Sequence, residues 1–253
     1  MTTCRRGVRF DGLLARITWI GHSTVLIEMD GVRLLTDPLL RSHVLHMRRV
    51  AEKAASPEAV DAVLISHAHY DHLDVTSLTR VAGNAKTIVP RGTGKRLLGW
   101  VDDVVEVDAG EEVAVGGVTV TATSAEHGPG KALGYLVRGS AQIYFAGDTD
   151  LFDGMRDFSA GLDVALLPIG GWGPRLPPGH LNPERAAQAL ELLRPRMVVP
   201  IHWGTYTRIG LSRDEAAPAR QFEELAAAQA PNVEVRVLPV GGSVEVAVEA
   251  CVR

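Results

Sequence analysis

The feature that most constrains the fold is a run of ligand-type side chains directly after an apolar segment. The apolar run 61–65 predicts a buried strand, and four such side chains follow it within six positions: His67, His69, Asp71 and His72. Imidazole and carboxylate groups are natural ligands of zinc and related ions. A single histidine is more often structural, but a chance match to all four positions is on the order of one in a thousand. The run therefore predicts a metal site, with the first two histidines facing one ion and Asp71 and His72 opening a helix toward a second.

Three further apolar segments are each followed by one ligand-type side chain. These side chains are His127, Asp148 and His202, after strands expected at 118–124, 142–146 and 197–201. Each alone is more simply explained as a polar loop residue. The repeated order of apolar strand, small residue and ligand favours one shared sheet edge and one shared site.

Two divalent ions about 3.5–4 Å apart need a bridging carboxylate and roughly three other protein ligands each. The seven candidate residues supply this number of ligands, with His67, His69 and His127 on one ion, Asp71, His72 and His202 on the other, and Asp148 bridging. A water between the ions would be deprotonated near neutral pH and would serve as the bridging hydroxide nucleophile. The expected cofactor is two divalent ions per chain, with zinc as first choice and manganese or iron as alternatives.

The rest of the pattern predicts alternating strands and helices in two similar halves. Strands are expected at 15–20, 24–29 and 32–36, and a second group between 104 and 146. Asn182 and Pro183 are the cap and first residue of an amphipathic helix ending at Leu193. Residues 39–59 are expected to form a loop with a short helix over the site, 93–100 a helix, and 214–228 another. Two αβ halves with facing sheets and outer helices are the expected arrangement, in a single domain over 1–253.

Together these residues resemble the metallo-β-lactamase superfamily. The resemblance rests on the seven ligand positions and runs from about residue 16 to 210. It implies an α/β (α+β) fold, the four-layer αββα sandwich, with a dinuclear site. The segments 19–27, 35–38, 63–74, 146–149, 167–170 and 201–205 resemble the branch that contains the N-acyl phosphatidylethanolamine phospholipase D enzymes. The ascorbate-phosphate lactonases are somewhat more distant.

The resemblance also implies roles for residues around the ions. Asp37 matches the aspartate placed behind a metal-bound histidine, although it is equally well explained as a turn residue before Pro38. His22, in a Gly-His-Ser turn, is a candidate for the same supporting shell or a hairpin polar residue. His180 is a candidate catalytic donor to the developing oxyanion, and Asp71 or a site water is expected to relay the proton. Trp172, Trp203 and Tyr206 are candidate pocket walls, with Trp203 beside a ligand.

The branch resemblance makes a phosphodiester the first choice of substrate. A lactonase, or another hydrolase of a cyclic ester or amide, would share every ligand. A non-catalytic metal-binding or sensor protein is an alternative of another class. An RNA-processing nuclease is disfavoured, because a net charge of -4 and a pI near 6.1 supply no basic field.

The expected partner is a small-molecule ester, with no nucleic acid and no membrane span, because no apolar stretch approaches membrane-spanning length. Segment 1–7 has no apolar signal core, so the expected location is cytoplasmic. Nothing in the sequence is typical of a membrane-docking face. Cys4 and Cys251 lie at opposite ends, outside any Cys-x-x-Cys spacing, and predict no thiolate metal site. Whether they pair, and the oligomeric state, stay open.

Overall fold

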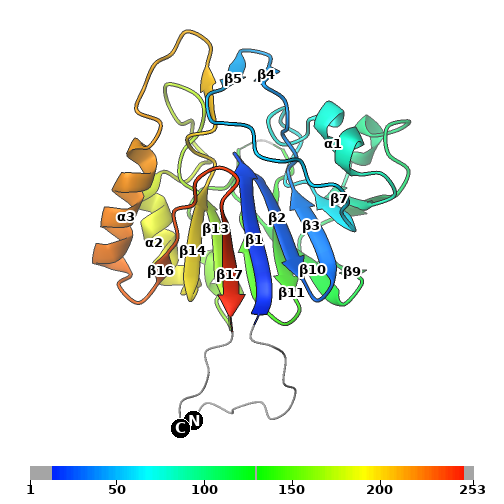
Figure 1. Cartoon of the computed structure of the whole chain (residues 1–253). Coiled ribbons are helices and arrows are strands. Elements are labelled where there is room, and N and C mark those ends of the chain that lie inside the picture. Colours follow the sequence, from blue (N-terminus) through cyan, green and yellow to red (C-terminus); the bar gives the residue numbers. More distant parts are fainter. Residues whose placement is uncertain (1–12, 129, 248–253) are drawn as a thin grey trace, which may run out of the picture.

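A computed structural model describes residues 13–128 and 130–247 of the chain. Two large β-sheets face each other in it, with helices on the outside (Figure 1). Cys4, Cys251 and the segment 1–7 lie outside the described residues. The prediction of a single domain over 1–253 therefore stays a prediction.

The first sheet combines the N-terminal strands with the last strand of the chain. Its strands are, in spatial order, β17 (Ser243–Ala247), β1 (Leu13–Gly21), β2 (Thr24–Met29), β3 (Val32–Thr36), β6 (Ala62–Leu64), β7 (Lys86–Pro90) and β8 (Val104–Val107). Strands β17 to β3 pair antiparallel, whereas β3, β6, β7 and β8 run parallel. The parallel strands therefore end at the same edge of the sheet.

The second sheet follows the same plan. Its strands are, in spatial order, β16 (Glu234–Val235), β14 (Met197–Ile201), β13 (Val164–Pro168), β12 (Gln142–Phe145), β11 (Leu133–Arg138), β10 (Val118–Ser124) and β9 (Glu112–Val115). Strands β12, β13, β14 and β16 run parallel, and the remaining pairs are antiparallel. The turns after β12 and β14 thus leave the sheet on one side.

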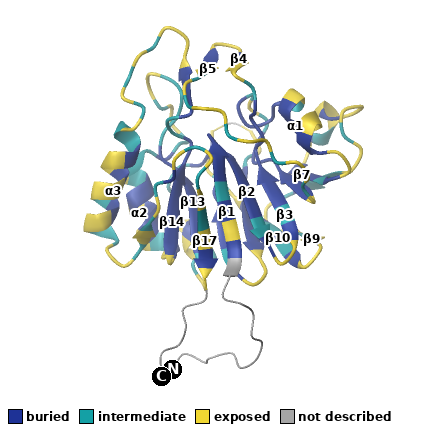
Figure 2. Cartoon of the chain, in the orientation of Figure 1, coloured by how far each residue is buried: buried dark blue, intermediate teal, exposed yellow. Residues whose placement is uncertain are grey.

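The four layers are held together by three apolar interiors. Trp19, Tyr135 and Phe145 are among the side chains buried between the two sheets. Figure 2 shows the strands of both sheets largely in the buried colour. Helix α1 (Val75–Val81) packs on the outer face of the first sheet, and helices α2 (Pro183–Leu193) and α3 (Ala217–Gln229) cover the second. This arrangement confirms the predicted α/β fold, a four-layer αββα sandwich.

A small third sheet stands above the facing edges of the large ones (Figure 1). It consists of β15 (Tyr206–Arg208), β5 (Met47–Arg49) and β4 (His43–Val44). The helix expected within 39–59 was therefore wrong, because pairing of β5 with β15, far away in sequence, overrides local preference. Among the described residues no helix is both long and apolar enough to cross a membrane.

Two other local predictions were wrong. Residues 93–100 form only a short 3-10 helix, Gly94–Arg96, in a segment where Gly99 has a positive φ. Asp71 and His72 do not open helix α1, because Asp74 is its N-cap and accepts a hydrogen bond from the Ser77 backbone N–H. Helix α3 begins three residues later than expected. A second 3-10 helix covers Asp153–Phe158.

Candidate metal centre

The first cluster of potential ligands contains three histidines from two turns. The turn after β6 supplies His67 and His69, and the loop after β10 supplies His127. Nε2 of His67 lies 2.8 Å from Nδ1 of His69, and Nε2 of His127 lies 3.2 Å from the same atom. Three imidazole nitrogens thus meet at one point, as one metal ion requires.

The second cluster contains four buried side chains, His22, Asp71, His72 and His202, whose ligand atoms lie within 4.8 Å of one another. Asp71 Oδ2 lies 3.2 Å from His22 Nε2 and 3.7 Å from His72 Nε2. The His22 ring lies 3.9 Å, centroid to centroid, from the ring of His202. The structure thus brings together the three ligands expected for the second ion and adds His22 to them.

Asp148 lies between the clusters, as a bridging group requires. Its Oδ2 lies 3.1 Å from His72 Nε2 and 3.4 Å from His180 Nε2, and its Oδ1 lies 3.4 Å from His202 Nε2. Gly147 permits this approach: its φ is +61°, and a Cβ there would lie 2.6 Å from Ser66 Cβ. Only glycine fits at that position without displacement of the turn that carries His67.

The donor set fits divalent ions. Three buried atoms, His72 Nε2, Asp148 Oδ1 and His202 Nε2, make no well-aligned hydrogen bond in the part of the chain that the structure describes, although the Asp148 carboxylate lies 3.1 Å from the first ring nitrogen and 3.4 Å from the second. A buried polar atom left unpaired costs about 1–3 kcal/mol, so three converging on one centre call for an explanation. Coordination of a cation by nitrogen and carboxylate oxygen supplies it.

The opposite ring nitrogen of three candidate histidine ligands is also fixed. The Nδ1–H group of His127 donates to Gly179 O at 2.7 Å, and that of His202 donates to Gly170 O at 2.7 Å. The Nδ1–H group of His72 donates to Asp37 Oδ2 at 2.8 Å. Such partners fix the tautomer that directs Nε2 at a metal, which is the role expected for Asp37.

Backbone strain concentrates at the same place. Three of the six non-glycine residues with positive φ among those described are His22 (54°), Asp37 (31°) and His202 (63°). Such conformations cost of order 1–3 kcal/mol each and persist where the surroundings impose them. Their gathering around one cluster points to a functional site.

Burial and neighbouring charges shift the pKa values of the side chains in the site. Burial alone would raise the pKa of the Asp148 carboxyl, but the charge of His72 and the hydrogen bonds from His180 and His72 outweigh burial and hold this pKa well below its ordinary value. Burial alone would lower the pKa of His72, but Asp148 and Asp71 raise it well above the ordinary value. Burial lowers the pKa of His67 well below its ordinary value and that of His202 to about 3. Both histidines therefore stay neutral, the form that binds metal.

These shifts predict how acid destabilises the metal-free protein. The folded-state pKa of His202 is about 3, and the ordinary value is 6.5, so between these pH values the unfolded chain binds more protons. The free energy of unfolding should fall as pH drops from 6.5 toward 3, by at most about 1.4 kcal/mol per pH unit for this residue. His67 adds to the fall in the same direction.

Urea unfolding of metal-free protein at pH 6.5, 5.5 and 4.5 measures the effect. His202→Asn, which cannot titrate, should give a shallower slope. His72 does not reverse the trend, because a raised pKa contributes stability that is fully present below 6.5 and lost only at higher pH. A stability that rises on acidification would contradict this account.

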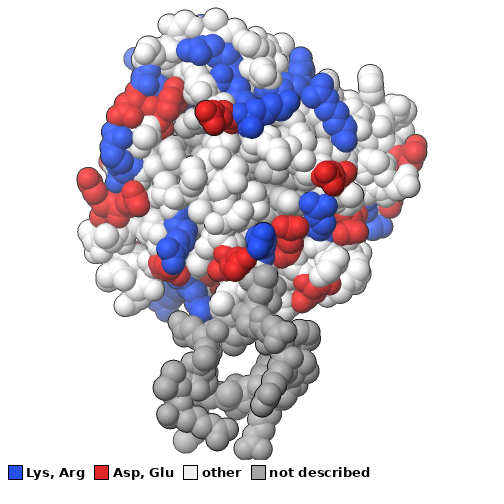
Figure 3. All heavy atoms as spheres, viewed as in Figure 1, with Lys and Arg blue, Asp and Glu red and all other residues white. Residues whose placement is uncertain are grey.

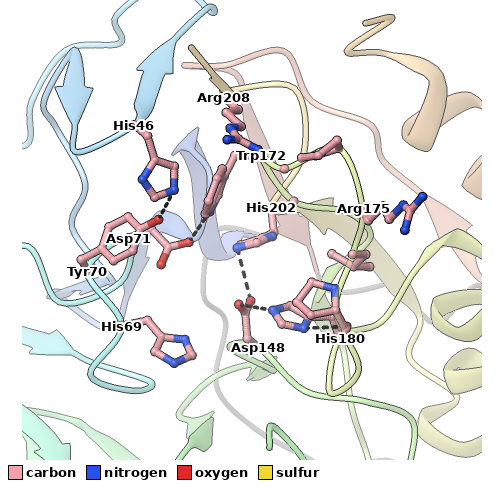
Figure 4. Close-up of a pocket in the computed structure, with 15 residues that line it drawn as sticks. His46, His69, Tyr70, Asp71, Asp148, Trp172, Arg175, His180, His202 and Arg208 are labelled. Atoms are coloured by element: carbon pink, nitrogen blue, oxygen red, sulfur yellow. Dashed lines mark hydrogen bonds and ion pairs between the residues drawn. The ribbon is translucent and has the colours of Figure 1, made fainter. Parts of the chain in front are cut away.

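A pocket of about 710 Å³ opens onto His69 of the first cluster and onto Asp71 and His202 of the second (Figure 4). Its wall contains the candidate site residues His69, Asp71, Asp148, His180 and His202. The other wall residues include the loop residues His46, Tyr70, Trp172 and Leu176 and, at the end of β15, Arg208. Trp172 Nε1 donates to Asp71 Oδ2 at 3.0 Å, and Tyr70 Oη lies 3.1 Å from His46 Nε2. The pocket thus gives a substrate access to the candidate ligands.

Of the remaining candidate residues, one lies in the pocket and one does not. His180 lies in the pocket, with its ring centroid 4.5 Å from that of His127. Trp203 does not line the pocket but stacks on Trp19 at 5.1 Å, so the substrate contact considered for it is withdrawn. Sequence reasoning missed Tyr70 and His46 as pocket walls, and no local signal marks them, because their partners come from other loops.

Comparison with known proteins agrees with this geometry. The model of the β-lactamase superfamily domain matches residues 32–203. A metal-dependent hydrolase of Methanopyrus kandleri is 34% identical, over 91% of this chain and 99% of that protein. An N-acyl-phosphatidylethanolamine-hydrolyzing phospholipase D of Caenorhabditis elegans is 30% identical, over 85% of this chain and 70% of that protein.

This chain spans less than two thirds of the length of another relative. An uncharacterized protein of Mycobacterium tuberculosis is 37% identical, over 78% of this chain but only 61% of its own length. Among solved structures, a metallo hydrolase of Ignicoccus hospitalis has a TM-score of 0.69 at 27% identity, covering 91% of this chain and 97% of that one. From the matched domain and the arrangement of its ligand-type side chains, the chain belongs to the metallo-β-lactamase superfamily of metal-dependent hydrolases and resembles its N-acyl-phosphatidylethanolamine-hydrolyzing branch.

Proposed function

We propose that this chain uses two divalent ions, with zinc as first choice, to hydrolyse a phosphodiester. The observation that carries the proposal is the convergence of three unpaired buried atoms, on His72, Asp148 and His202, beside a cluster of three histidines. The Caenorhabditis relative supports the substrate class, since by its name it hydrolyses a phospholipid. That support is an analogy, because one fold hosts many chemistries.

Each residue has one task in the proposed site. His67, His69 and His127 would hold one ion and Asp71, His72 and His202 the other, with Asp148 as the carboxylate shared between them. The bound ions polarise the ester and lower the pKa of water, which is the chemistry they supply. The protein contributes the fixed geometry, through the hydrogen bonds that orient each imidazole.

His180 is the proposed proton donor. Burial alone would lower its pKa, but Asp148 raises the pKa above the ordinary value, which favours the protonated imidazole near neutral pH. Its ring lies in the pocket and is held by an Nδ1–H donation to Pro177 O at 3.0 Å. An imidazolium there can donate to the leaving oxygen as negative charge develops.

Asp71 is the weaker candidate for proton relay. Burial alone would raise its pKa, but His72 and the hydrogen bond from His22 hold the pKa below its ordinary value. A carboxylate with a lowered pKa is a poor proton acceptor, so its proposed role is to hold the ion.

The rim of the pocket favours an anionic substrate over a neutral lactone. Figure 3 shows Lys and Arg side chains gathered at the top of the molecule, where Figure 1 places β4 and β5. The segments 41–50 and 206–213 contain five arginines and no Asp or Glu: Arg41, Arg48, Arg49, Arg208 and Arg213. Arg41 pairs with Asp74 and Arg213 with Glu215, and Arg208 is the one of the five that lines the pocket. In a chain of net charge -4, such a local positive field attracts a phosphodiester and has little effect on a neutral ester.

Replacement of one rim arginine tests the substrate class. Arg208 lines the pocket and is exposed, so Arg208→Ala should raise KM for an aryl phosphodiester by about 3- to 10-fold, equivalent to about 1 kcal/mol. KM for an acyl-homoserine lactone should not change. Arg16→Ala, an exposed arginine on β1 paired with Glu245, is the matched control.

Turnover of the metal-loaded protein on both substrates, with Asp148→Ala as the blank, tests the proposal itself. Metal-dependent cleavage of the diester supports it. Cleavage of the lactone with an inert diester would move the protein to the lactonases. Tight metal binding without turnover of either ester would favour a metal-binding or sensor protein instead.

A further inference from the structure

We infer that His22 is a positioning residue of the second ion's site, where its Nε2–H group holds the Asp71 carboxylate in its ligating orientation. The inference rests on the proposed function and adds a residue outside the ligand set assigned above. Its basis is a strained turn, a shared hydrogen-bond acceptor and contact with a second ligand.

The turn between β1 and β2 holds the His22 backbone from two sides. The backbone N–H group of His22 donates to Thr205 Oγ1 at 2.8 Å. Its carbonyl oxygen accepts from Trp19 Nε1 and from the backbone N–H group of His202, both at 2.9 Å. The turn is therefore joined directly to the turn that carries a ligand of the second ion.

The identity of the residue in this turn is informative. His22 has a φ of 54°, a left-handed conformation that glycine adopts without cost and asparagine with little cost. A turn needing only backbone geometry would be more stable with either. A buried imidazole in a strained position indicates that the side chain has a task.

The contacts of the ring show that task. His22 is only 2% exposed, and its Nε2 lies 3.2 Å from Asp71 Oδ2. Trp172 Nε1 donates to the same oxygen at 3.0 Å. Among the described residues Asp71 Oδ1 accepts no hydrogen bond, so both donors act on Oδ2, which lies 3.7 Å from His72 Nε2, and together they fix the orientation of the carboxylate in the cluster. Donors behind a ligating carboxylate typically contribute 10- to 100-fold to metal affinity.

Two amide replacements test which ring nitrogen matters. The amide nitrogen of His22→Gln lies near the position of Nε2, whereas that of His22→Asn lies near the position of Nδ1. The readout is the dissociation constant of each Zn²⁺ ion, measured by chelator competition, together with the visible spectrum of the Co²⁺-loaded protein. Neither readout depends on turnover.

We expect His22→Asn and His22→Ala to weaken one of the two ions by about 10- to 100-fold and to leave the other unchanged. His22→Gln should stay within about threefold of the parent protein. His43→Ala, an exposed histidine on β4, should change nothing. Urea unfolding of the metal-free variants separates loss of fold from loss of metal.

Three results would overturn the inference. Weakening by His22→Gln equal to that by His22→Ala would make His22 a direct ligand. Unchanged affinities in all three folded variants would leave His22 without a role at the ion. Fewer than two ions in the parent protein would remove the proposed function as well, so the stoichiometry of the parent tells the two failures apart.

Discussion

Replacement of Asp148 with alanine is expected to release at least one ion and to lower turnover on the order of 10³-fold or more. Asp148 is 2% exposed and contacts the ring nitrogens of His72, His180 and His202. Without it both clusters lose their shared anion, and the strongest influence that raises the pKa of His72 disappears. Metal content per chain and turnover on an aryl phosphodiester measure the two effects.

Two variants control for shape and for charge. Asp148→Asn keeps the shape of the side chain and removes its charge, so it should retain the fold and lose metal. Asp150→Ala removes another carboxylate of the same loop. The Asp150 side chain pairs with Arg185 and with no candidate ligand, so turnover of this variant should stay near that of the parent protein. Two ions per chain and normal turnover in Asp148→Ala would remove Asp148 from the centre.

Replacement of Asp37 with alanine should have the largest effect on stability. Asp37 is fully buried and accepts hydrogen bonds from the Ser66 backbone N–H at 2.7 Å, Ser66 Oγ at 2.5 Å and His72 Nδ1 at 2.8 Å. Each orphaned buried donor costs about 1–3 kcal/mol, so the free energy of unfolding should fall by about 3–5 kcal/mol. Urea unfolding of the metal-free protein measures the loss.

Asp37→Asn, which keeps a carbonyl oxygen for the Ser66 backbone N–H, should lose roughly half as much. Asp61→Ala removes an exposed carboxylate that accepts from the Arg33 backbone N–H, and about 1 kcal/mol or less is expected for it. A change below about 0.5 kcal/mol in Asp37→Ala would mean that these hydrogen bonds do not support the site.

The parts of the site that the sequence could predict share one property, which is that their signal is local. His67 to His72 follow a strand directly, and Asp148 and His202 each follow another. Parallel strands deliver their ends to one edge, so strand order alone brings these ligands close together. The fold could be predicted for the same reason, because apolar runs and turn residues mark most strand boundaries.

The parts that could not be predicted depend on contacts between distant segments. Residues 47–49 form a strand, where the sequence predicted a loop with a short helix, because β5 pairs with the distant β15. The hydrogen bond from Trp172 to Asp71 likewise joins residues 101 positions apart. The basic rim likewise forms only when segments 41–50 and 206–213 meet. Local sequence patterns do not predict contacts between segments that are distant in the sequence.

The most direct test of the central claim is a titration of metal-free protein with Zn²⁺ during turnover of an aryl phosphodiester. The account predicts no turnover without metal and a rise that ends at two ions per chain, as two clusters joined by Asp148 require. A rate that reaches its maximum at one ion, or that persists in chelator, would contradict the paired centre.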